Sequence, residues 1–135
     1  MSPAEQARFD ALVEDAIDAL PPRVRELLDE VPVVVLDQPE AGMLEDLGID
    51  PGDDEALDDL CGLHTGTAIT ERSVEHADAP TVIHLFRRGI VALAGGWEQE
   101  GADDEIYEEV RTTLLHEIGH HFGLDEGDLD QLGYA

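Results

Sequence analysis

Hydrophobic positions near the amino terminus recur at the spacing of a helix. Before them, Ser2 and Glu5 stand at the separation of a capping box, and Pro3 occupies the first turn, where a helix accepts proline. The pair Pro21-Pro22 interrupts the pattern and begins a shorter apolar segment. The pattern predicts two amino-terminal helices, which we expect to cover a sheet. Their apolar positions are Phe9, Leu12, Val13, Ala16, Ile17 and Leu20 in the first helix and Val24, Leu27 and Leu28 in the second.

Two apolar runs further along the chain predict strands. Val33–Leu36 is short and rich in β-branched residues, which is typical of a buried strand. Thr81–Phe86 is a second strand, and the turn-forming residues 87–89 lead into an apolar run at 90–94, so the pattern allows a hairpin. Residues 38–60 are rich in acids, glycine and proline, and we expect a mostly irregular segment with one or two helical turns.

The last apolar pattern predicts a long helix between Asp103 and Gly123, with acids at its positive end. Its apolar positions are Ile106, Val110, Leu114, Ile118 and Phe122. We expect this face to pack against the sheet. A chain of 135 residues with 42% hydrophobic content can bury one core, so we expect a single α/β domain over residues 1–135.

Charge narrows the range of partners. The chain carries 33 acids against seven arginines and no lysine, for a formal net charge of -26. Such a charge repels phosphate backbones and anionic membranes, so we expect no binding to nucleic acid or membrane. The chain has neither a long uninterrupted apolar run nor a basic, apolar leader, which favours the cytoplasm. The single cysteine, Cys61, has no partner for an internal disulfide, and we interpret it as a buried thiol.

Candidate chemistry concentrates in the run His116-Glu117-Ile118-Gly119-His120-His121-Phe122-Gly123. Residues four apart on a helix point the same way, so His116 and His120 can offer imidazole nitrogens to one ion. Glu117 lies about 100° round the helix, where it can reach a water on that ion. Gly123 is suited to end the helix, and the acids beyond it are candidates for a third ligand. Because Zn²⁺ accepts two imidazoles and a carboxylate, zinc is the predicted cofactor.

This layout resembles the zincins, and most closely the small bacterial zincin-like metallopeptidases, whose motif is His-Glu-x-x-His-x-x-Gly-x-x-Asp. Matched by position, His116 and His120 take the zinc-ligand places and Glu117 the place of the catalytic base. The family's aspartate falls on Glu126, which is one methylene longer, and Asp125 stands directly before it. Either acid is therefore a candidate for the third ligand.

The resemblance extends beyond the motif. The segment Gly62–Ser73 and the strand-like run that ends at Arg87-Arg88 are also similar to family segments, so the resemblance covers about the last eighty residues. It implies an α/β (α+β) fold, with a small twisted mixed sheet, an edge strand that lines a cleft, amino-terminal helices and the motif helix packed beneath. We expect the two arginines to form ion pairs rather than to bind a substrate carboxylate.

Two residues near the motif are candidates for supporting roles. His121 points about 140° away from His116, so we expect it to pack or hydrogen-bond, and it is the substitute ligand if Glu126 does not reach the metal. Tyr134 either supports the site, donates its hydroxyl to an oxyanion or lies in a frayed terminus. The methionine turn of the metzincin branch has no counterpart, because Met43 is the last methionine.

The resemblance implies hydrolysis of peptide bonds, in which zinc at His116, His120 and Glu126 activates a water and Glu117 takes its proton. The substrate is then a peptide or protein, which we expect to add to the strand at 81–86 through main-chain hydrogen bonds. Two alternatives stay open: a catalytically weak or inactive scaffold that binds a basic protein through its acidic surface, and a hydrolase of non-peptide amides. An exposed sheet edge is compatible with a monomer or a homodimer.

Overall fold

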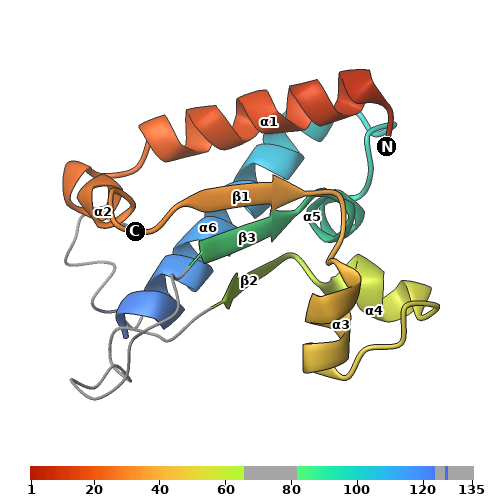
Figure 1. Cartoon of the computed structure of the whole chain (residues 1–135). Coiled ribbons are helices and arrows are strands. Elements are labelled where there is room, and N and C mark those ends of the chain that lie inside the picture. The colour runs from red at the N-terminus through yellow and green to blue at the C-terminus, as the bar shows by residue number, and fades with distance from the viewer. Residues whose placement is uncertain (66–81, 124–126, 128–135) are drawn as a thin grey trace, which may run out of the picture.

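The computed structural model describes residues 1–65, 82–123 and 127, which form helices around a small sheet (Figure 1). The elements in chain order are α1 (Pro3–Asp18), α2 (Pro22–Leu27), β1 (Val33–Leu36), α3 (Ala41–Leu47), α4 (Asp54–Asp59), β2 (Gly62–Thr65), β3 (Val82–Phe86), α5 (Arg87–Ala94) and α6 (Ala102–Phe122). Helices and a mixed sheet in one core are the α+β architecture that the sequence predicted.

The first two helices begin where the sequence predicts. The hydroxyl of Ser2 accepts a hydrogen bond from the backbone N–H of Glu5, and the Glu5 carboxylate accepts one from the backbone N–H of Ser2, both at 3.1 Å. These bonds form the predicted capping box, which satisfies donors that a helix start leaves unpaired. α2 begins at Pro22, directly after the break. α1 packs mainly along α6. Phe9 and Val13 lie on its buried face and belong to the same hydrophobic core as the residues of the sheet.

The sheet has the strand order β1-β3-β2, with β1 parallel and β2 antiparallel to β3. β3 takes the centre because its apolar residues are the most deeply buried, with Ile83, Leu85 and Phe86 fully inaccessible to solvent. Both sides of β3 are therefore paired, and the prediction that a peptide adds to the strand at 81–86 is wrong. Among the described strands, β2 is the edge strand nearer the motif helix.

The motif helix packs on one face of this sheet. α6 contacts both β2 and β3 and passes behind them in Figure 1. Its fully buried stripe consists of Ile106, Val110, Leu114 and Ile118, which pack with Ile83, Leu85 and Phe9. These are the apolar positions that the periodicity predicted, so the core holds α6 in place along its length. None of the described helices is both long enough and apolar enough to cross a membrane.

Residues 87–94 form the helix α5 and not the second strand of a hairpin, so that expectation is wrong. Gly89 allows the helix to lie directly on the chain after α4, because a Cβ at this position would stand 1.9 Å from the carbonyl oxygen of Leu60. Ile90 and Val91 face the core. Gly95 ends the helix in the left-handed conformation, with φ 107°. An apolar run this short does not by itself distinguish a strand from a helix.

The arginines at the start of α5 form the ion pairs that the sequence predicted. Arg87 contacts Asp10 of α1 and Asp37 after β1, in each case at 2.9 Å. Arg88 contacts Asp58 of α4 at 2.7 Å and Asp54 at 3.0 Å. The start of α5 is therefore connected by ion pairs to α1, to α4 and to the residue that follows β1.

The segment 38–60 is more ordered than expected, since it contains the helices α3 and α4. α3 ends at Gly48, whose φ of 71° lies in the left-handed region. α4 begins at Asp53, whose carboxylate accepts a hydrogen bond from the backbone N–H of Ala56 at 3.1 Å. Leu44 of α3 and Leu57 of α4 are buried. One buried leucine in each helix, together with the caps at Gly48 and Asp53, is therefore enough to order this strongly acidic segment.

Candidate metal centre

The helix α6 presents the motif in its last two turns. The helix begins with Asp103, Asp104 and Glu105 at its positive end and stops at Gly123, which has φ 66°. Leu114 and Ile118, on either side of the first motif histidine, are fully buried. The motif therefore stands on an anchored helix, as a metal site requires.

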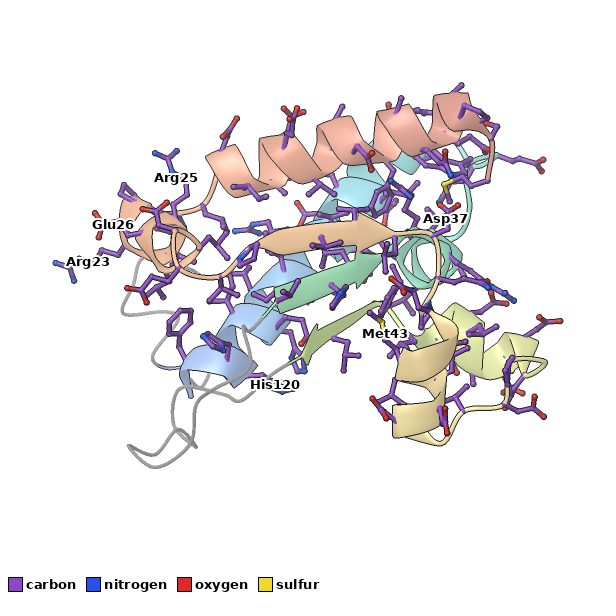
Figure 2. The ribbon with its side chains drawn as sticks, viewed as in Figure 1. Arg23, Arg25, Glu26, Asp37, Met43 and His120 are labelled. Carbon is purple, nitrogen blue, oxygen red and sulfur yellow. The ribbon has the colours of Figure 1, made fainter. Side chains whose placement is uncertain are left out.

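His116 and His120 lie next to each other on the exposed side of α6. Their ring centroids are 4.2 Å apart and the rings are inclined by 58°. Both residues are exposed, and Figure 2 shows His120 at the carboxyl end of the helix. Two adjacent imidazoles that reach solvent fit two ligand positions of a zinc ion.

Glu117 differs from the two histidines in its burial. It is 7% exposed and lies where the edge strand β2 begins. A Cβ on Gly62 would stand 3.1 Å from Cγ of Glu117 and 2.7 Å from Cγ2 of Thr113. The missing side chain at Gly62 therefore allows β2 to approach α6 at the position of the glutamate.

A shallow cavity of about 290 Å³ opens beside this contact. It is lined by Asp59, Leu60, Cys61, Gly62, Leu93, Glu109, Thr112, Thr113, His116 and Glu117. A larger cavity, of about 700 Å³, lies near Met1 and Trp97 and includes no motif residue. The smaller cavity places motif side chains next to the edge strand, so it belongs to the candidate site.

Cys61 lines the same cavity. Burial raises the pKa of its thiol to about 11, with further contributions from the negative charges of Glu109 and Asp59, while a hydrogen bond with Thr113 opposes the shift. The thiol therefore stays protonated near pH 7. Cys61 is partly buried, and not fully buried as the sequence predicted.

The described residues supply two neighbouring ligands and no complete metal site. Within residues 1–65 and 82–123, no group of three or more histidine, cysteine, aspartate or glutamate side chains is arranged to hold a metal ion. The predicted third ligands Glu126 and Asp125 lie outside the described residues, and so does Tyr134. A third ligand after Gly123 would complete the set that the two histidines begin.

One comparison with known proteins identifies the family. The model of the zincin-like metallopeptidase family matches residues 28–134, which is most of the chain and includes the whole motif. The chain belongs to the zincin-like metallopeptidase family. Its members generally bind zinc, in agreement with the paired imidazoles of α6. No curated protein matches the sequence.

Two other histidines of this zincin-like protein are packed differently from the motif pair. His121 is 2% exposed and meets the ring of Phe122 edge-on, with centroids 4.4 Å apart. Its packing is what the sequence predicted from its angular position on the helix. His84, on the central strand, stacks with Phe86, and burial lowers the pKa of its imidazole.

Sequence reasoning did not identify Glu109 and Asp59 as neighbours of the zincin-like motif. Glu109 stands seven positions before His116, which is close to two helical turns, so the spacing already placed both on one side of α6. Asp59 could not be found in this way, because it reaches the cavity from the end of α4.

Proposed function

We propose that this protein is a zinc-dependent peptidase. His116 and His120 provide two zinc ligands, Glu126 provides the third with Asp125 as the alternative, and Glu117 is the general base. The observation that carries the proposal is the pair of exposed imidazoles 4.2 Å apart, next to a buried glutamate at the edge of the sheet. Membership of the zincin-like family supports the same chemistry.

The roles of the residues follow from their positions. Zinc, when bound, acts as a Lewis acid that acidifies water and polarises a carbonyl group. Glu117 accepts the proton of the attacking water through its carboxylate and then donates that proton to the leaving nitrogen. Its burial restricts bulk water around the carboxylate, and the contact with Gly62 restricts its position.

The edge strand β2 is the proposed platform for the substrate. The sequence predicted this role for the strand at 81–86, but that strand is paired on both sides. An extended peptide that hydrogen-bonds to the free edge of a strand is held in one orientation by main-chain groups. Because β2 starts against Glu117, a peptide on this edge lies beside the proposed base.

A second candidate is a catalytically weak or inactive scaffold that binds a basic protein. The formal net charge of -26 favours it, as does the substitution of Glu126 for the aspartate of the family motif. Such binding is electrostatic, so it weakens strongly as salt is added, whereas hydrolysis depends on zinc.

Zinc content and hydrolysis, measured together, test the proposal. We expect about one zinc per chain by elemental analysis in the wild type and in Glu117→Gln, and none in His116→Ala or His120→Ala. Hydrolysis of a mixed peptide library should occur only in the wild type and in Glu108→Gln, a control on the same helix outside the cavity. A Glu117→Gln variant with full zinc-dependent hydrolysis would exclude this mechanism, and an absence of zinc after titration with excess Zn²⁺ would favour the scaffold.

A further inference from the structure

The cavity beside the motif extends away from the metal-binding histidines along α6. Glu109 and Glu117 both line it, and they are eight positions apart on the helix, which corresponds to about 12 Å along its axis. The end of α4 and the start of β2 form the facing side, and Leu93 of α5 stands at the rim, where it is exposed. A peptide held on β2 would therefore have space beside it for one long side chain.

The lining of this cavity combines apolar surface with negative charge. Leu60, Leu93 and the methyl groups of Thr112 and Thr113 offer apolar contacts, and Asp59 and Glu109 add two carboxylates. No lysine or arginine is among the described residues that line it. A long side chain with an apolar stem and a positive head matches both properties.

Among the described residues, no cation is paired with either of these two carboxylates, in contrast to their neighbours in the sequence. Asp58 is paired with Arg88 at 2.7 Å, and Glu108 with Arg111 at 3.6 Å. In the part of the chain that the structure describes, neither Asp59 nor Glu109 is in a side-chain ion pair.

The negative charges of Asp59 and Glu109 act on a group in the wall of the cavity. Each of them contributes to the raised pKa of Cys61, which stands on the cavity wall. A cation that entered the cavity would therefore be attracted by two carboxylates that none of the described arginines neutralises.

We propose that this cavity is a subsite for an arginine or lysine side chain of the peptide substrate, with Asp59 and Glu109 as its specificity-determining residues. The inference rests on the proposed function, since it names the substrate class of the same site. The carboxylates bind the cationic head, and Leu60, Leu93 and the two threonines contact the aliphatic stem. An acidic side chain is excluded by charge repulsion, and a short one leaves the carboxylates without a partner.

Binding to a protein that cannot hydrolyse its ligand tests the subsite directly. The probes are two fluorescein-labelled tripeptide amides that differ only in a central arginine or its neutral isostere citrulline, and the protein is Glu117→Gln with and without zinc. We expect the arginine probe to bind about tenfold more tightly. Adding Glu109→Gln or Asp59→Asn should weaken the arginine probe about three- to tenfold and leave the citrulline probe unchanged.

A matched control separates this subsite from the general acidity of the surface. Glu105→Gln removes the same charge one turn earlier on α6, at an exposed position that does not line the cavity. Equal binding of the two probes, or equal losses in Glu105→Gln and Glu109→Gln, would overturn the proposal. Because Asp59 is exposed at the end of α4, its variant gives the same test should Glu109→Gln fail to fold.

The result also distinguishes the subsite from the proposed function. An arginine preference in binding without any hydrolysis by the wild type would support the subsite and reject the peptidase. Zinc-dependent hydrolysis that cleaves arginine and citrulline peptides equally would support the peptidase and reject the subsite.

Discussion

Glu117 and Gly62 lie so close together that a Cβ on Gly62 would stand 3.1 Å from Cγ of the glutamate. This contact joins the start of the edge strand to the proposed catalytic base. It depends on a residue without a side chain, and Thr113 lies even closer to the same point, at 2.7 Å. The relationship has consequences for stability and for catalysis.

Substitution of Gly62 by alanine should push β2 away from α6. We expect a loss of about 1–3 kcal/mol in the free energy of unfolding, because the added methyl group overpacks a contact with Thr113 and Glu117. We also expect zinc-dependent hydrolysis to fall more than zinc content does, since the edge strand moves relative to the base. Urea unfolding and hydrolysis assays measure the two effects.

Gly42→Ala is the matched control for this substitution. Gly42 lies in α3, and a Cβ there would meet nothing within 4 Å. Alanine should therefore stabilise the protein by about 0.5–1 kcal/mol through helix propensity, without any effect on hydrolysis. If Gly62→Ala behaved like Gly42→Ala, the close contact between β2 and α6 would be refuted.

Gly89→Ala should be more damaging than Gly62→Ala. The new Cβ would stand 1.9 Å from the backbone oxygen of Leu60, and backbone cannot rotate away as a side chain can. We expect a loss of more than about 3 kcal/mol, because α5 must separate from the chain after α4. Thermal unfolding measures it, and a loss below that of Gly62→Ala would contradict the packing of α5 described here.

Removal of Arg87 should destabilise the junction between β3 and α5. Its side chain is 12% exposed and contacts Asp10 and Asp37, both of which are about half exposed. A fully buried ion pair costs about 3–5 kcal/mol when broken and a surface pair at most about 1 kcal/mol, so we expect about 2 kcal/mol for Arg87→Gln. Urea unfolding of this variant gives the value.

Arg23 provides the comparison for Arg87. It is exposed on α2 and projects away from the fold in Figure 2. Arg23→Gln should change the free energy of unfolding by less than about 0.5 kcal/mol. Similar losses in the two variants would mean that net charge, and not the ion pairs of Arg87, determines the effect.

The thiol of Cys61 should make stability decrease at high pH. Its pKa rises from 9.0 to about 11 on folding, chiefly because of burial. Below pH 9.0 the thiol is protonated in both states, and between pH 9.0 and about 11 only the unfolded chain releases the proton. The free energy of unfolding should therefore fall across this window.

Cys61→Ala isolates that contribution. The variant should lose less stability than the wild type between pH 8 and pH 10.5 in urea unfolding, and alkylation of the native wild type by iodoacetamide at pH 8 should be slow until urea is added. Rapid alkylation of the native protein at pH 8, or parallel stability curves for the two proteins, would contradict the raised pKa of the thiol.

Local signals in the sequence determined where several elements begin and end. The capping box of Ser2 and Glu5, the proline at Pro22 and the glycine at Gly123 each act on one helix terminus, and each was found where predicted. The strand at Val33–Leu36 was also predicted with its observed bounds. Such signals involve residues only a few positions apart, so they do not depend on which other elements the helix or strand packs against.

The central residues of the candidate site are also close together in the sequence. His116, Glu117 and His120 belong to one helix, so their spacing alone predicts that two imidazoles lie together and that a glutamate stands beside them. The family motif could be recognised for the same reason. The third ligand stays a prediction, because Asp125 and Glu126 lie outside the described residues.

Tertiary structure decided which elements meet at that helix. Residues 82–86 became the central strand and residues 87–94 a helix, where the sequence allowed an edge strand and a hairpin. The close packing of Gly62 against Glu117, and the cavity that Asp59 and Glu109 both line, bring together segments about fifty residues apart in the chain. Periodicity reports which side of an element is buried but not what covers it, so pairing partners, the edge strand and the cavity arise only when the whole core packs.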